Sequence, residues 1–140
     1  MSLNNFKFYY LFVFLVFGMC AVGCNDDEDN NDDDHNDNMV TVAIASPTNG
    51  GTIADCSVVH VHIDVIASVE NHQVEVLLYE RDTEEEVLDI DMHDHDTMIL
   101  IERDLDLCNY AAGTCFVLDV LACVNHSCEE TSTATAEFCL

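Results

Sequence analysis

Basic side chains are almost absent from this chain of 140 residues. It has three Lys and Arg against 28 Asp and Glu, which gives a formal net charge of -25 at pH 7. Nucleic acids and anionic membrane surfaces would repel that charge over a Debye length of roughly 8 Å. The composition therefore excludes polyanions, nucleic acid above all, as binding partners.

Catalytic motifs are missing as well. The chain has no GxSxG nucleophile elbow and no HExxH motif, and its five Gly form no phosphate-binding loop. If six of its eight cysteines are paired in disulfides, no free thiol remains in the folded part to act as a nucleophile. We therefore expect a binding or structural protein and not an enzyme.

The N-terminal segment has the pattern of a secretory signal peptide. Lys7 is its single charge, and the run Phe8–Phe17 is wholly apolar. This run is shorter than the roughly 20 residues that cross a bilayer. It therefore predicts a signal peptide over residues 1–23.

The small residues Ala21, Val22 and Gly23 directly before Cys24 resemble the lipobox of bacterial lipoproteins. A lipobox usually has Leu where this chain has Ala21. The resemblance implies that Cys24 is lipidated, becomes the mature N-terminus and anchors the protein in the outer membrane. The alternative is a plain secretory peptide that is cleaved near Gly23.

An acidic stretch follows the predicted anchor. Residues 25–38 comprise eight acids, five Asn and one His, so they have no apolar surface to bury and repel one another. We predict a disordered tether over residues 24–38. An acidic run directly after a lipidated cysteine resembles the export signals of surface-exposed lipoproteins in some Gram-negative bacteria, which implies that the domain lies on the cell surface.

Residues 39–140 have a hydrophobic period of two, which is typical of β-strands, and they lack helix-period stripes. In the clearest segment the odd-numbered residues from Val59 to Ala67 are apolar, whereas His60, His62 and Asp64 lie on the opposite face. We predict one all-β domain, a seven-stranded antiparallel β-sandwich. Its strands are Val40–Ile44, Val59–Ala67, Val74–Leu78, Val87–Met92, Thr97–Leu107, Phe116–Val124 and Thr131–Phe138, and a Pro/Gly turn occupies residues 46–51.

Three segments resemble the first two, the third and the penultimate strands of bacterial immunoglobulin-like domains: VTVAIASPTNGGTIADCSVVHVHIDVIAS, HQVEVLLYE and FVLDVLACVN. The resemblance implies an immunoglobulin-like fold over nearly all of residues 39–140. The chain departs from true immunoglobulins because it has no Trp on the third strand and no Tyr two places before Cys123. Domains of this kind serve as adhesins, spacers and binding modules, so the fold does not decide the function.

Six cysteines follow Cys24, an even number that predicts disulfides formed in an oxidising compartment. Fifteen pairings are possible. The antiparallel topology places four of the six at one end of the sandwich and two at the other. We favour two local bridges and one long one: Cys108–Cys115, Cys123–Cys128 and Cys56–Cys139.

Histidines are the most informative polar residues, and four of the seven form His-x-His pairs, His60/His62 and His93/His95. Two residues apart on a strand, both imidazoles of a pair lie on one face. Neutral imidazole is a common ligand of zinc, copper and nickel. We therefore predict a site for a divalent transition metal, zinc or copper, whose ligands are His60, His62, His72, His93, His95 and Glu70.

The number of metal sites stays open. The topology favours two, an upper one with Glu70, His72, His93 and His95, and a lower one in which His60 and His62 are completed by Asp64 or Glu102. If the strand at residues 87–92 pairs beside the strand at 59–67, the two His-x-His pairs form one four-His site instead. A calcium loop over Asp89–Asp94 is a further alternative, whereas His126 and His35 are expected to be incidental.

These features predict a surface-anchored lipoprotein whose single domain binds a divalent transition metal for acquisition, buffering or delivery. The competing interpretation is a non-catalytic adhesive or structural module that recognises a protein or a glycan through its loops. A third interpretation has no ligand at all, because histidines simply occupy exposed strand positions in a chain with few Lys and Arg.

Overall fold

The computed structural model describes residues 38–140, which form eight β-strands and no helix. Within this part of the chain no helix is long and apolar enough to cross a membrane. The predicted signal peptide, Cys24 and residues 24–37 of the predicted tether lie outside the described residues. The strands are β1 (Val40–Ser46), β2 (Gly51–Thr52), β3 (Val59–Ala67), β4 (Gln73–Glu80), β5 (Glu86–His93), β6 (Met98–Leu105), β7 (Cys115–Cys123) and β8 (Thr131–Cys139).

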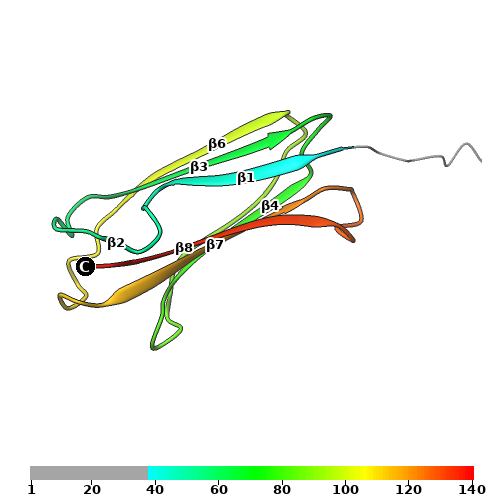
Figure 1. Cartoon of the computed structure of the whole chain (residues 1–140). Helices are drawn as coiled ribbons and strands as arrows, with labels where there is room; N and C mark the ends of the chain where they lie inside the picture. Colours follow the sequence, from blue (N-terminus) through cyan, green and yellow to red (C-terminus); the bar gives the residue numbers. More distant parts are fainter. Residues whose placement is uncertain (1–37) are drawn as a thin grey trace, which may run out of the picture. The chain divides into compact units, whose positions relative to one another are not determined.

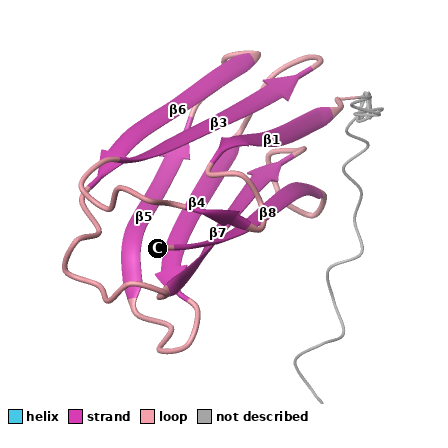
Figure 2. Cartoon of the chain, turned by 60° about the vertical axis from the view of Figure 1, so that its left-hand side comes forward, coloured by secondary structure: helices cyan, strands magenta, loops and turns pink. Residues whose placement is uncertain are grey.

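The strands form two sheets that lie one above the other (Figures 1 and 2). One sheet has three strands in the order β1-β3-β6, and the other has five in the order β2-β8-β7-β4-β5. All neighbours are antiparallel except β2 and β8, which are parallel. The prediction of an all-β domain with two antiparallel layers is confirmed, and each of the seven predicted strands is present.

The eighth strand, β2, is the element that the sequence does not reveal. It has only two residues and lies at the end of the predicted Pro/Gly turn. A Cβ atom on Gly51 would lie 2.7 Å from the carbonyl oxygen of Thr48, so the turn needs glycine at that position. The backbone of Gly51 then pairs with Phe138 and extends the edge of the five-stranded sheet.

The core forms because alternate residues of the strands are apolar and point inward. The odd-numbered residues of β3 from Val59 to Ala67 are buried, as are Val74, Val76 and Leu78 of β4. Phe116 and Phe138 stack between the sheets with ring centroids 5.5 Å apart. Burying each such side chain contributes about 1.5–3 kcal/mol, and this inward face leaves the polar side chains of the same strands on the outer surface.

The disulfides correct two of the three predicted bridges. The structure pairs Cys56 with Cys108, Cys115 with Cys139 and Cys123 with Cys128, so Cys123–Cys128 is confirmed and the other two predicted bridges are wrong. The strand register explains the difference. Cys56 lies three residues before Val59 and Cys108 three residues after Leu105, and Val59 pairs with Leu105, so this bridge extends the β3–β6 ladder. Cys115 and Cys139 are direct partners across β7 and β8.

We predict that the Cys56–Cys108 bridge stabilises the fold most. It links residues separated by 52 positions, whereas Cys123 and Cys128 are separated by five. By loop entropy, replacing both cysteines of the long bridge by Ala should lower the free energy of unfolding by about 4 kcal/mol, against about 2 kcal/mol for the short one. Urea unfolding of the two double variants measures the order, and a larger loss in the Cys123→Ala/Cys128→Ala chain would contradict it.

Candidate metal centres

Three connections meet at the end of the domain where β3, β5 and β7 finish. The pairing of β4 with both β5 and β7 sets Gln73 opposite His93 and Val74 opposite Ala122. His72 directly precedes β4, His93 ends β5, His95 lies in the β5–β6 connection, and His126 lies in the β7–β8 turn. The fold therefore gathers histidines from three separate parts of the sequence at one place.

Four imidazoles form a closed ring of contacts at this end. Their ring centroids are 5.6 Å apart for His72 and His95, 4.7 Å for His95 and His93, 6.1 Å for His93 and His126, and 5.9 Å for His126 and His72. In a tetrahedral zinc site, with Zn–N bonds of about 2.0–2.1 Å, the centroids of bound imidazoles lie about 5 Å apart. We call these four histidines and Glu70 the end cluster.

One pair of ring nitrogens lies at the spacing of metal ligands. His93 Nε2 lies 3.1 Å from His95 Nε2, and two nitrogens on one tetrahedral zinc lie about 3.3 Å apart. Glu70 Oε2 lies 3.2 Å from the other nitrogen of His95, Nδ1. Ligand atoms of Glu70, His72 and His95 also lie within 4.8 Å of one another. Glu70 is thus placed either to bind a metal or to accept the Nδ1 proton of His95 and orient its ring.

His72 is the unusual member of the cluster. It is only 5% exposed, and neither of its ring nitrogens has a hydrogen-bond partner. A buried polar group without a partner costs about 1–3 kcal/mol. Glu70 is half-buried and the other three histidines are exposed. The cluster is therefore buried at His72 and open to solvent at the other histidines.

Backbone hydrogen bonds hold the β5–β6 connection against His72. Asp94 N donates to the carbonyl oxygen of His72 at 2.9 Å, and Asn71 Nδ2 donates to the carbonyl oxygen of Asp96 at 2.6 Å. Asp94 Oδ1 accepts from Asp96 N at 2.9 Å, which shapes the turn that carries His95. The side chains of Asp94 and Asn71 therefore help to shape the loop that positions the histidines.

Asn38 ties the two sides of the end cluster together. It is 5% exposed, and its Nδ2 donates to the carbonyl oxygens of Glu70 at 2.7 Å and Val124 at 2.9 Å. Its Oδ1 accepts from Val69 N at 3.0 Å. Asn38 is the last residue of the predicted tether, yet this side chain links the connection that carries Glu70 to the strand that leads into the His126 turn.

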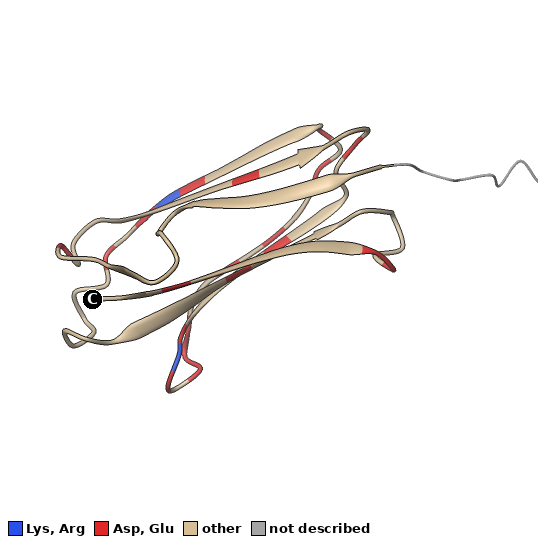
Figure 3. Ribbon diagram, in the orientation of Figure 1, with Lys and Arg blue, Asp and Glu red and all other residues tan. Residues whose placement is uncertain are grey.

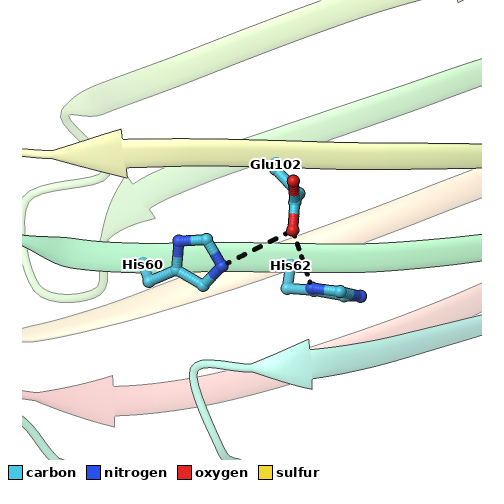
Figure 4. A group of neighbouring side chains, drawn as sticks. All are labelled: His60, His62 and Glu102. Atoms are coloured by element: carbon cyan, nitrogen blue, oxygen red, sulfur yellow. Dashed lines mark ion pairs between the residues drawn. The ribbon is translucent and has the colours of Figure 1, made fainter.

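A second group lies on the outer face of the three-stranded sheet (Figure 4). It comprises His60, His62 and Glu102, and we call it the sheet-face triad. Glu102 Oε1 lies 3.3 Å from His62 Nδ1 and 3.9 Å from His60 Nε2. The register sets Glu102 directly opposite His62 on β6.

The two groups lie on different sheets, so the single four-His arrangement is wrong. Strand β5, which carries His93, pairs with β4 at the edge of the five-stranded sheet and not with β3. The calcium loop is also overturned, because Asp89 and Asp91 belong to the regular strand β5. A third set, Cys115, Glu137 and Cys139, offers no thiolate, since its cysteines form a disulfide.

Negative charge surrounds both groups. Acidic residues are spread over both sheets and their connections (Figure 3), and the described part of the chain contains only two basic residues, Arg81 and Arg103. Arg81 pairs with Asp82 and Glu137, which raise the pKa of its guanidinium, and Arg103 donates to the carbonyl oxygen of Glu102. Such a field concentrates cations near the surface.

Two residues of the end cluster region escape sequence reasoning. His126 was expected to be incidental, but the tight β7–β8 turn closed by Cys123–Cys128 brings it beside His72 and His93. The predicted Cys123–Cys128 disulfide could have indicated the position of His126, because a short disulfide loop at the end of β7 fixes where the turn lies. Nothing in the sequence distinguishes Asn38, because it ends a run of Asn and Asp.

No protein-family model matches this chain. No curated protein is similar to it in sequence. The function is therefore inferred from the geometry of these two groups.

We predict that Asn38→Ala destabilises the domain by about 1–3 kcal/mol, because the carbonyl oxygens of Glu70 and Val124 lose a buried donor. Asn109 is exposed and serves as the matched control, so Asn109→Ala should change the free energy of unfolding little. Chemical unfolding of both variants tests this, and equal stabilities would contradict the structural role of Asn38.

Proposed function

We propose that the domain binds a divalent transition metal at the end cluster. The buried His72 carries the proposal, since both of its ring nitrogens lack a hydrogen-bond partner while the imidazoles of His95 and His126 contact its ring. Coordination would give one of these nitrogens a partner and would offset the cost of burying it. A histidine kept only for packing would gain nothing from this arrangement.

The donor set favours zinc or copper. Imidazole nitrogens suit zinc, copper and nickel, whereas calcium and magnesium prefer six or more oxygen ligands. The end cluster offers four imidazoles and a single carboxylate, Glu70. The buried His72 would be held in place by packing, and the exposed histidines would let the ion enter and leave. This arrangement suits acquisition, buffering or delivery.

The fold is proposed to be immunoglobulin-like. Support comes from the strand order, because β1, β3 and β6 form one sheet, while β8, β7 and β4 are neighbours in the other. Immunoglobulin domains arrange their first, second and fifth strands, and their last, sixth and third strands, in the same way. In place of the missing Trp, the core of this domain contains the stacked pair Phe116 and Phe138.

The protein is further proposed to be a lipoprotein, anchored in the outer membrane through Cys24 and exposed on the cell surface. Support comes from the apolar run before the small residues at positions 21–23 and from the acidic stretch after Cys24. Three disulfides among the described cysteines agree with an oxidising compartment.

We predict opposite effects of His72→Leu on stability and on metal binding. In the metal-free chain, Leu removes the unpartnered ring nitrogens, so the free energy of unfolding should stay unchanged or rise by about 1 kcal/mol. Zinc should no longer raise the melting temperature through the end cluster, because binding to the native state alone is what stabilises it. Calorimetry of the metal-free and zinc-loaded chains measures both effects, with His60→Ala/His62→Ala present in every chain so that zinc acts only through the end cluster.

Two exposed pairs provide matched controls for this test. His93→Ala/His95→Ala should abolish zinc stabilisation at the end cluster without disturbing the core, whereas His60→Ala/His62→Ala should retain it. If His72→Leu destabilises the metal-free chain and leaves zinc stabilisation intact, His72 is a packing residue and the proposal fails. The adhesive or structural interpretation would then stand.

For the anchor, we predict that Cys24→Ala abolishes lipidation, because the lipid attaches to that thiol. Cys20→Ala is the control, since Cys20 lacks the small residues before it that a lipobox requires. Expression in a Gram-negative host with a labelled fatty acid, followed by membrane fractionation, distinguishes the variants. Label and membrane association that persist in the Cys24→Ala chain would contradict the proposal.

A further inference from the structure

The sheet-face triad is built from paired positions of two regular strands. Strands β3 and β6 are antiparallel, with His62 opposite Glu102 and His60 opposite Asp104. The buried faces of Val59, Val61 and Ile63 hold β3 against the core, so His60 and His62 must both point outward. Functional side chains on packed strands are held more precisely than functional side chains on loops.

The atoms of the triad converge on one point. The ring centroids of His60 and His62 are 6.1 Å apart. Glu102 Oε1 lies 3.9 Å from His60 Nε2 and 3.3 Å from His62 Nδ1, and we call these two atoms the inner nitrogens (Figure 4). Two nitrogen or oxygen ligands on one tetrahedral metal ion, at bond lengths of about 2.0–2.2 Å, lie about 3.3–3.6 Å apart. Closing the triad around an ion therefore needs only small side-chain movements.

The outer nitrogen of each ring faces a different carboxylate. His60 Nδ1 lies 2.7 Å from Asp104 Oδ1, and His62 Nε2 lies 3.4 Å from Asp64 Oδ2. When each neutral ring donates its proton to that carboxylate, the inner nitrogen is left as a bare acceptor. Both inner nitrogens and Glu102 Oε1 are then acceptors that face one another, and a metal ion between them would satisfy all three. A carboxylate on the far nitrogen is the arrangement that orients metal-bound histidines.

We propose that His60, His62 and Glu102 form a second site for a divalent transition metal, whose remaining coordination positions take a nitrogen or oxygen donor from outside the chain. The triad supplies three ligands, and its side chains are between 30% and 52% exposed. Sites with three protein ligands keep a position for water or an external ligand, whereas four protein ligands close a structural site. Two His and one carboxylate on one face form such an open set.

This open site differs from the end cluster in both place and ligand number. The end cluster has four imidazoles, of which that of His72 is buried. The triad has two imidazoles and lies on the outer face of the three-stranded sheet. The two proposed sites are independent, because they share no residue. Variants in one group therefore leave the test of the other intact.

Cobalt is a suitable probe, because its visible absorption reports coordination geometry. In the full chain carrying His93→Ala/His95→Ala, one equivalent of Co²⁺ should bind at the triad and absorb in the visible range. Added imidazole should then change the spectrum, because it occupies an open position. A Co²⁺ spectrum that imidazole does not alter would show a closed site and overturn the proposal.

Glu102→Gln in the same chain should remove the bound Co²⁺, while the exposed Glu86→Gln removes an equal charge elsewhere and should leave it in place. Asp104→Asn tests the positioning of His60 and should weaken Co²⁺ binding by about tenfold without removing it. Far-UV circular dichroism should be unchanged in all three, since the replaced side chains are exposed. No Co²⁺ binding in the parent chain, or equal binding after Glu102→Gln and Glu86→Gln, would overturn the proposal.

Discussion

The alternation of side chains along β3 is the constraint on which the rest of the molecule depends. Its odd-numbered residues from Val59 to Ala67 form the middle of the core, and β3 is the central strand of its sheet. Once this face points inward, His60 and His62 must face solvent, and the register with β6 decides that Glu102 meets them. The same ladder, extended past the ends of the strands, joins Cys56 to Cys108. Core, bridge and surface site thus share one cause.

The end cluster has a different origin. Its histidines come from connections and strand ends, and hydrogen bonds from Asn38 and Asn71 hold those connections in place. A buried imidazole without partners opposes folding unless something else satisfies it. The domain therefore contains one site fixed by regular strands and one fixed by loops, and the loop site has the unsatisfied buried group. We expect this difference to set how tightly and how reversibly each one binds an ion.

The sequence was sufficient for seven of the eight strands, because a period of two is a strong signal when most inward residues are Val, Ile or Leu. It offered Glu102 only as an alternative to Asp64, because the register that sets Glu102 opposite His62 cannot be read from the hydrophobic pattern. The sequence was insufficient to predict the disulfide partners of Cys56 and Cys139. Four cysteines lie at the same end of the sandwich, and the choice among them depends on ladder positions that the composition does not encode. His126 was missed because the path of a turn depends on tertiary contacts.

The central claim is that imidazoles of the end cluster hold a metal ion. X-ray absorption at the zinc edge tests it most directly, on the His60→Ala/His62→Ala chain loaded with one equivalent of zinc. We expect a first shell of nitrogen and oxygen at about 2.0–2.1 Å together with the outer-shell scattering of three or four imidazole rings. A shell of oxygen ligands without imidazole scattering, or a sulfur shell at about 2.3 Å, would contradict it.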